Sequence, residues 1–207
     1  MTMDKNNQTP FVVLARTIML CAVFLLTGCA SEPPHADEVA AKDPLRIYVS
    51  GNKAYLYGIL GRDLTSQLKN MIRKHPNVTD LVLVDVPGRD DEEAVIESAR
   101  LIRSLGLNTH IARTGYVLSG GVDLFLGGVK RTIGAGAGVG VHTWIDESGK
   151  LPKNTDVSDA INATYINFYL SMGVPERFYW FSLKAAPADR VYFLSPEEMY
   201  DYKLITE

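Results

Sequence analysis

Residues 81–88 read LVLVDVPG, a nearly continuous apolar run that is closed by Pro87-Gly88. Such a run suits a strand that is buried on both faces in a parallel sheet. Residues 94–105 follow with the spacing of an amphipathic helix, which Gly106 ends, and residues 109–112 suit the next short strand. Strand, helix and strand in this order predict a parallel crossover unit, and therefore a layered α/β fold.

The alternation of strands and helices continues in both directions from this unit. Upstream, Gly51-Asn52 separates two β-rich stretches, which predicts a hairpin over residues 46–58. Downstream, Ser195, Pro196 and Glu198 have the spacing of a helix N-terminus with a capping box. The other expected elements are a helix over 64–72, a glycine-rich turn into a helix over 115–128, a strand over 139–144, a helix over 161–172 and a strand over 191–194.

The composition is that of a soluble globular domain of ordinary size. The chain has 207 residues, of which 46% are hydrophobic and 22% are charged. A formal net charge of −3 gives no electrostatic reason to expect nucleic acid as a partner. No internal repeat or second domain is evident.

The N-terminus has the order of an export signal. Lys5 and Arg16 precede an uncharged apolar run over residues 17–26, which is shorter than the about 20 residues needed to span a bilayer. Leu26-Thr27-Gly28-Cys29 then resembles the lipobox of bacterial lipoproteins. The sequence therefore predicts a signal peptide over residues 1–28 and lipidation of Cys29, including palmitate. The alternative is a plain signal anchor with an incidental cysteine.

This interpretation places the rest of the chain in the bacterial cell envelope. Residues 29–44 are polar and suit a flexible linker from the lipid to a domain over residues 45–207. The membrane, reached through the lipid on Cys29, is then a partner. The absence of aspartate after Cys29, where Ala30 stands, favours the outer membrane by analogy with other lipoproteins, with the domain facing the periplasm. Cys21 would leave with the leader, so the mature domain would have no free thiol and no disulfide.

Two side chains suit nucleophilic catalysis. Ser119 lies in a glycine-rich turn, and His142 follows an apolar stretch of the expected strand over residues 139–144. A serine hydroxyl needs a base at neutral pH, and histidine suits that role. Gly88 and Gly120 stand where main-chain N–H groups could stabilise an oxyanion. The sequence has no dinucleotide-binding pattern and no metal-ligand spacing, so we expect neither a cofactor nor a metal.

Most of the mature domain resembles the ClpP-like proteins of the ClpP/crotonase superfamily, in particular a group of exported bacterial members. In that group a strand ends in Ser-Pro-Gly-Gly, a helix ends in Ile-Arg-Ser-Leu-Gly-Leu, a Cys-Ala-Ser-Ala-Cys turn holds the nucleophile and Gly-Ala-x-x-Gly-x-His brings the base. The corresponding residues here are 86–89, 102–107, 117–121 and 136–142, with a further likeness over 193–205. An ungapped alignment back from His142 places Ser119 on the nucleophile.

The resemblance implies a layered β-β-α superhelix with Ser119 as nucleophile, His142 as general base, and Gly88 and Gly120 as the oxyanion hole. Asp189 is the nearest candidate for the third member of a Ser-His-Asp triad, but the ungapped position falls on the residues after it, so a Ser-His dyad is the alternative. Arg89 replaces the second glycine of the Pro-Gly-Gly turn, and its side chain would crowd a substrate strand.

Three functions remain open at this stage. The first is a membrane-anchored periplasmic serine hydrolase that acts on a peptide or protein. The second is an inactive ClpP-fold lipoprotein that serves as a binding or assembly module, and Arg89 motivates it. The third is an acyl-CoA enzyme of the crotonase type, which the export signal disfavours. Relatives of this fold assemble into rings or trimers, so the resemblance also implies a homo-oligomer.

Overall fold

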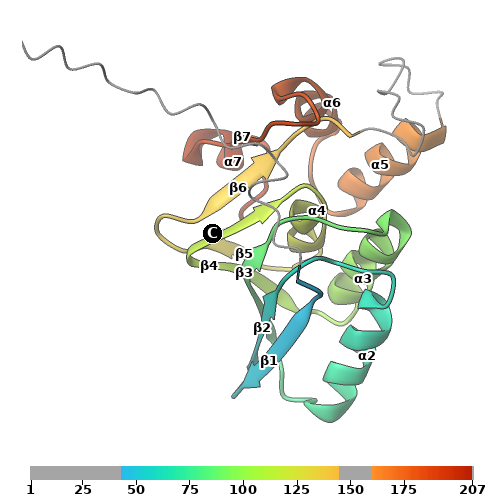
Figure 1. The fold of residues 1–207 in the computed structure, drawn as a ribbon, viewed down its shortest axis with the longest axis vertical. Coiled ribbons are helices and arrows are strands. Elements are labelled where there is room, and N and C mark those ends of the chain that lie inside the picture. Colours follow the sequence, from blue (N-terminus) through green and yellow to red (C-terminus); the bar gives the residue numbers. More distant parts are fainter. Residues whose placement is uncertain (1–42, 145–159, 207) are drawn as a thin grey trace, which may run out of the picture. The chain divides into compact units, whose positions relative to one another are not determined.

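The computed structural model describes residues 43–144 and 160–206, which form a mixed α/β structure (Figure 1). The predicted leader, Cys29 and most of the predicted linker lie outside the described residues. Asp43 and Pro44, predicted as the end of the linker, are bonded to the residues that follow β2 (Lys53–Tyr57). The Ile59 N–H donates to the Asp43 carbonyl at 2.9 Å, and Pro44 pairs with Ile59. Within the described residues, no helix is both long enough and apolar enough to cross a membrane.

One sheet with the strand order β1-β2-β3-β4-β6-β7 organises the domain, and β5 pairs with β4. The strands β2, β3, β4 and β6 run parallel, whereas β1 and β7 are antiparallel to their neighbours at the two edges. The predicted hairpin and the predicted buried parallel strand are therefore confirmed. The strands are β1 (Arg46–Ser50), β2 (Lys53–Tyr57), β3 (Asp80–Val86), β4 (Asn108–Leu118), β5 (Arg131–Ile133), β6 (Gly138–Val141) and β7 (Tyr192–Phe193).

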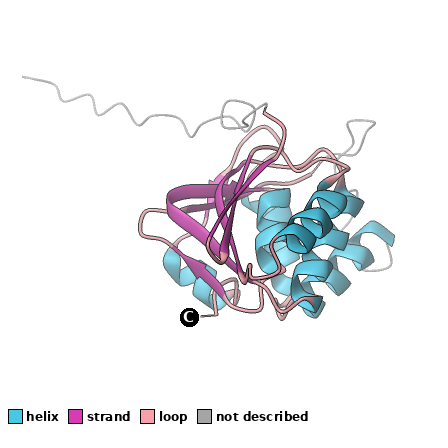
Figure 2. Cartoon of the chain, turned by 90° about the horizontal axis from the view of Figure 1, so that it is seen from below, coloured by secondary structure: helices cyan, strands magenta, loops and turns pink. Residues whose placement is uncertain are grey.

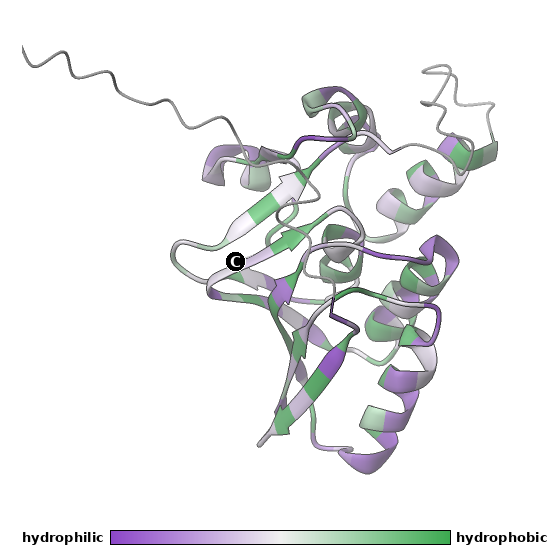
Figure 3. Ribbon diagram, viewed as in Figure 1, coloured by the Kyte–Doolittle hydropathy of each residue, from purple (hydrophilic) through white to green (hydrophobic). Residues whose placement is uncertain are grey.

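Most of the helices lie together on one side of the sheet (Figure 2). Figure 3 shows hydrophobic residues along the strands and hydrophilic residues on the outer part of α2, as expected for a helix that buries only Leu64, Thr65, Leu68 and Met71. The helices are α2 (Leu64–Lys74), α3 (Glu92–Ser104), α4 (Gly120–Leu126), α5 (Ala160–Ser171), α6 (Glu176–Ala185) and α7 (Pro196–Asp201). All seven residues of α4 are buried, so this short helix is central to the core.

Local signals in the sequence explain where several helices begin. The Asp91 side chain caps α3 by accepting a hydrogen bond from the Ala94 N–H at 2.9 Å. Ser195 and Glu198 form the predicted capping box at the start of α7. The sequence analysis missed β5 and α6. The aromatic stretch over residues 178–181 lies in α6, where Phe178 and Tyr179 are buried in the core.

The length of β4 positions the site. The sequence predicted a short strand over residues 109–112, but β4 continues to Leu118. Gly115 permits this extension because a Cβ atom there would lie 2.5 Å from the Val84 carbonyl oxygen. The register then pairs Val86 with Val117 and Leu118 with Gly140. The carboxyl ends of β3, β4 and β6 therefore lie side by side, which is where open α/β sheets form ligand crevices.

Candidate active site

Ser119 occupies a strained turn between a strand and a helix. It follows β4 directly, precedes α4, and has φ 50° and ψ −122°. A positive φ is unfavourable for a side chain larger than glycine, and such strain persists only where the surroundings impose it. Here the Ser119 N–H donates to the Gly140 carbonyl at 3.1 Å, and the Ser119 carbonyl accepts from the Val122 N–H at 2.9 Å. This is the geometry that presents a nucleophile at the end of a strand.

Gly121 makes this turn possible. A Cβ atom on Gly121 would lie 2.3 Å from the Val86 carbonyl oxygen. The end of β3 and the start of α4 can therefore approach each other only because Gly121 has no side chain. This contact holds the turn that carries Ser119 close to the end of β3.

His142 follows the end of β6 and is half-buried. Its Nδ1 lies 2.7 Å from the Thr143 carbonyl oxygen. Since a carbonyl oxygen only accepts, Nδ1 carries the proton in this bond and Nε2 is left with a lone pair in the neutral ring. The Thr143 N–H in turn donates to the Ala186 carbonyl at 2.9 Å, which fixes the peptide that orients the ring. The imidazole is thus held in the tautomer that a general base requires.

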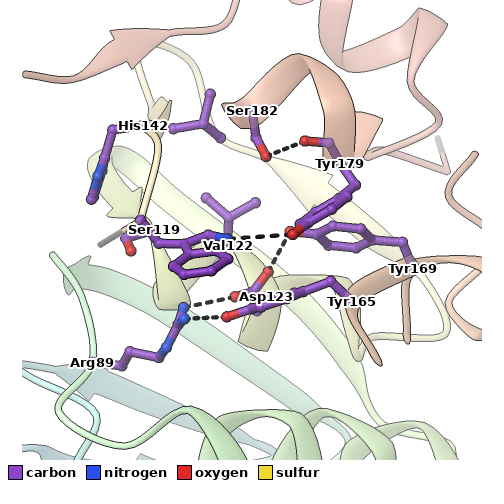
Figure 4. A pocket seen from close by; sticks show the side chains of 11 residues that line it. Arg89, Ser119, Val122, Asp123, His142, Tyr165, Tyr169, Tyr179 and Ser182 are labelled. Carbon is purple, nitrogen blue, oxygen red and sulfur yellow. Dashed lines mark hydrogen bonds and ion pairs between the residues drawn. The ribbon is translucent and has the colours of Figure 1, made fainter. Parts of the chain in front are cut away.

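Ser119 and His142 line the same pocket, which has a free volume of about 40 Å³ (Figure 4). Figure 4 shows both side chains on the same side of this pocket. The pairing of β4 with β6 explains how residues so far apart in sequence meet, because each residue comes just after one of these neighbouring strands. The other lining residues are Arg89, Val122, Asp123, Val141, Trp144, Tyr165, Tyr169, Tyr179 and Ser182.

The two glycines predicted for the oxyanion hole do not line the pocket themselves, but each is the chain neighbour of a residue that does, Gly88 of Arg89 and Gly120 of Ser119. Gly88 comes two residues after the end of β3, and Gly120 is the first residue of α4. Within residues 43–144 and 160–206, no hydrogen-bond acceptor is found for the N–H group of either glycine. Both groups are therefore available as donors in the described part of the chain.

Asp189 is not brought into this pocket. It is exposed, in the turn between α6 and β7, and it is not a lining residue. The Nδ1 atom that a triad carboxylate would orient is bonded to the Thr143 carbonyl instead. The geometry therefore fits a Ser-His dyad with a main-chain acceptor better than the triad with Asp189.

The sequence analysis did not predict the buried acidic and aromatic side chains that line the pocket. Asp123 is only 3% exposed, although it lies within an apolar helix. Its Oδ2 accepts from Arg89 Nη1 at 3.1 Å, and its Oδ1 accepts from the Tyr169 hydroxyl at 2.9 Å. Arg89 Nη2 also donates to the Tyr165 hydroxyl. A single carboxylate within the apolar stretch of residues 120–126 was the signal that could have revealed it, because a buried charge needs a partner.

Arg89 crosses directly over Gly120. A Cβ atom on Gly120 would lie 2.6 Å from Arg89 Cδ and 2.8 Å from Arg89 Cβ. The Arg89 side chain therefore lies beside the predicted oxyanion-hole residue Gly120; that it would crowd a substrate strand stays a prediction. Only 15% of this side chain is exposed, so it lies along the pocket that Ser119 also lines rather than extending into solvent.

The buried charges of the pocket act on one another. Burial lowers the pKa of Arg89, but Tyr165, Asp123 and Glu92 together raise it above the ordinary value, so the guanidinium stays charged. Burial raises the pKa of Asp123, while the Arg89 charge and the Tyr169 hydroxyl act in the opposite direction.

Burial lowers the pKa of His142. The hydrogen bond to the Thr143 carbonyl opposes this shift, and the Arg89 charge adds to it. His142 is therefore neutral at pH 7, as a base must be.

The described residues contain no group of three or more His, Cys, Asp or Glu side chains that could hold a metal ion. The pocket itself offers a serine hydroxyl, a neutral imidazole and a buried carboxylate.

Comparison of the fold with solved structures identifies its class. The chain is similar to the 1510-N membrane-bound stomatin-specific protease, solved as a mutant with a substrate peptide (17% identity, TM-score 0.50, 76% of this chain and 75% of that chain). It is also similar to the 1510-N membrane protease specific for a stomatin homolog from Pyrococcus horikoshii (14% identity, TM-score 0.50, 73% and 69%). A third match is methylmalonyl CoA decarboxylase (10% identity, TM-score 0.50, 80% and 67%). No protein-family model and no curated protein matches the sequence.

These likenesses define an α/β protein of the ClpP/crotonase fold, which confirms the predicted fold class. The fold is shared by a peptidase and by an acyl-CoA enzyme, so the function has to be argued from the site.

Proposed function

We propose that the chain is a serine hydrolase that cleaves peptide bonds through a Ser119–His142 dyad. The observation that carries the proposal is the strained backbone of Ser119, at the end of β4 and in the same pocket as a histidine whose Nδ1 is held by a carbonyl. Strain of this kind is retained where the position of a side chain matters for chemistry. The fold that the chain shares with a peptidase is consistent with this reaction.

The mechanism is acyl transfer. Ser119 Oγ attacks the substrate carbonyl while His142 Nε2 takes the hydroxyl proton. The N–H groups of Gly88 and Gly120 stabilise the negative oxygen of the tetrahedral intermediate. The protonated imidazole then gives its proton to the leaving amine, and a water molecule, activated by the same nitrogen, hydrolyses the acyl-enzyme. The Thr143 carbonyl keeps the ring oriented and favours its protonated form during these steps.

A fluorophosphonate tests this mechanism, because it phosphonylates serines that a base activates. We expect one adduct, on the peptide that contains Ser119. It should form in the wild-type chain or, where Arg89 blocks the probe, in Arg89→Ala, which removes the side chain that covers Gly120. Ser119→Ala should abolish the adduct. Ser182→Ala is the matched control, because Ser182 lines the same pocket but donates its hydroxyl proton to the Tyr179 carbonyl. Mass spectrometry locates the adduct, and labelling that persists unchanged in Ser119→Ala would overturn the proposal.

The proposed enzyme is anchored in the bacterial cell envelope through a lipid on Cys29, with its domain in the periplasm and the outer membrane as the favoured location. The lipobox-like residues 26–29 after an apolar run support this proposal. Incorporation of labelled palmitate in a bacterial host should be lost in Cys29→Ala. The control Cys21→Ala should keep the label, and incorporation that survives Cys29→Ala would contradict the anchor.

A second candidate function is an inactive binding or assembly module. The observation that favours it is the Arg89 side chain, which is mostly buried and lies over Gly120, next to Ser119. This alternative expects Ser119→Ala to leave the cellular role of the protein intact. A Ser119→Ala phenotype that equals loss of the whole protein would exclude it.

A further inference from the structure

The Arg89 guanidinium is bound in the pocket in the way in which a ligand would be bound. The side chain runs from the loop after β3, across Gly120, to the carboxylate of Asp123. Its Nη2 donates to the Tyr165 hydroxyl, and its guanidinium carbon lies 5.7 Å from the centre of the Tyr165 ring. An ion pair and an aromatic face together are the usual features of a binding site for a guanidinium.

The side chains that bind the guanidinium are held in place by contacts that do not involve Arg89. The Tyr169 hydroxyl fixes one oxygen of Asp123, and the rings of Tyr165 and Tyr179 stack with their centres 5.4 Å apart. The Tyr179 hydroxyl donates to Asn162 Oδ1 at 2.6 Å. Asp123 and these tyrosines therefore lie on the helices α4, α5 and α6, whereas Arg89 lies in a loop. Withdrawal of Arg89 would leave a formed pocket.

The position of the pocket relative to Ser119 suits a substrate side chain. Asp123 lies four residues after Ser119, about one helical turn along α4. Ser119 and Asp123 line the same pocket, so a peptide whose carbonyl carbon lay at Ser119 Oγ could place a neighbouring side chain in it. Both carboxylate oxygens of Asp123 already accept hydrogen bonds, one from Arg89 and one from Tyr169, so a substrate cation could take the place on Asp123 Oδ2 only if Arg89 left it.

Arg89 has a second acidic neighbour on the solvent side. Its Nη2 lies 3.4 Å from Glu92 Oε2, and the Glu92 side chain is 44% exposed. The guanidinium could therefore move outward and keep an ionic partner. Asp123, in contrast, is too deeply buried to pair with any cation that does not enter the pocket.

We infer that this pocket is the specificity pocket of the site, selective for an arginine or lysine side chain of a peptide, and that Arg89 occupies it in the unliganded protein. The inference rests on the proposed function in that it assigns the peptide's reacting carbonyl to Ser119. Arg89 is then an internal competitor of the substrate.

Benzamidine binding to the full chain tests the inference, because this probe is a planar cation with an aromatic ring. We expect Arg89→Ala to bind benzamidine at least about tenfold more tightly than it binds neutral benzamide, since charge-assisted hydrogen bonds to Asp123 form only with the cation. The wild-type chain and the control Arg62→Ala, which alters an arginine that is 93% exposed, should show no such preference. Isothermal titration calorimetry measures the affinities.

Asp123→Asn, added to Arg89→Ala, should remove the preference for the cation. Equal affinities for benzamidine and benzamide in Arg89→Ala, or a preference that survives Asp123→Asn, would overturn the inference. If Arg89→Ala does not fold, Arg89→Gln provides the same comparison, because its shorter, neutral side chain also leaves Asp123 without an ionic partner.

Benzamidine binding requires no reaction at Ser119. Cation binding without a fluorophosphonate adduct would therefore reject the hydrolase alone, and an adduct without cation binding would reject the specificity pocket alone.

Discussion

Replacement of Asp123 by alanine should lower the free energy of unfolding by about 3–5 kcal/mol, the loss expected when one partner of a buried ion pair is removed. The Asp123 side chain is 5% exposed and accepts from both Arg89 and Tyr169. Without it, the guanidinium loses its most buried partner and the Tyr169 hydroxyl loses its acceptor. Chemical denaturation, monitored by circular dichroism, measures the change.

A double-mutant cycle distinguishes this pairing from a simple loss of packing. Arg89→Met and Asp123→Leu should each destabilise the protein, because each leaves one buried charge of the pair without its partner. The combination Arg89→Met/Asp123→Leu should be considerably more stable than the sum of the single losses predicts, since it leaves no unpaired charge. Arg62→Ala is the surface control and should change little. Losses that add in the double variant would contradict the buried-pair interpretation.

The pH dependence of Arg89→Met follows from Asp123. Burial already raises the pKa of Asp123, and removal of Arg89 eliminates a charge that lowers it. Above about pH 3.9, the ordinary aspartate pKa, Asp123 has lost its proton in the unfolded state but still holds it in the folded state, until the pH passes the raised pKa. The stability of this variant should therefore fall as the pH rises from that value through the raised pKa of the folded state.

Local patterns in the sequence predicted most of the fold. The run over residues 81–86 is a buried parallel strand, and Ser195 with Glu198 caps α7 as expected. Each of these features depends on residues that lie close together in the chain. The missed elements are β5, which has three residues, and α6, where an aromatic stretch gave no polar face to recognise. The extension of β4 to Leu118 depends on the contact between Gly115 and β3, which no local pattern reveals.

The candidate site was predicted only in part for the same reason. The family resemblance marked Ser119 and His142, and the structure places both in one pocket. The partner of the histidine is a carbonyl that is positioned by Ala186, beyond the reach of spacing arguments. The pairing of Arg89 with Asp123 joins residues 34 positions apart, and only the fold brings them together.

His142→Gln should lower the rate of fluorophosphonate reaction at Ser119 by about 10²–10⁴-fold, the usual contribution of a general base. A glutamine side chain cannot act as a base near neutral pH, although its amide can still form hydrogen bonds. In the wild-type chain burial, together with the Arg89 charge, lowers the pKa of His142. The rate should therefore be constant near neutral pH and should fall only below the ordinary histidine pKa of about 6.5.

The pH profile separates a basic role from a structural one. In Arg89→Gln the inflection should move to higher pH, because the nearby positive charge is gone, and in His142→Gln it should disappear. His110→Gln is the matched control: His110 is also half-buried and also bonds through Nδ1, at 2.7 Å to Thr132 Oγ1, but it does not line the pocket. Its replacement should leave both rate and profile unchanged. A His142→Gln variant that folds and reacts at the wild-type rate would show that Ser119 is activated by something other than this imidazole.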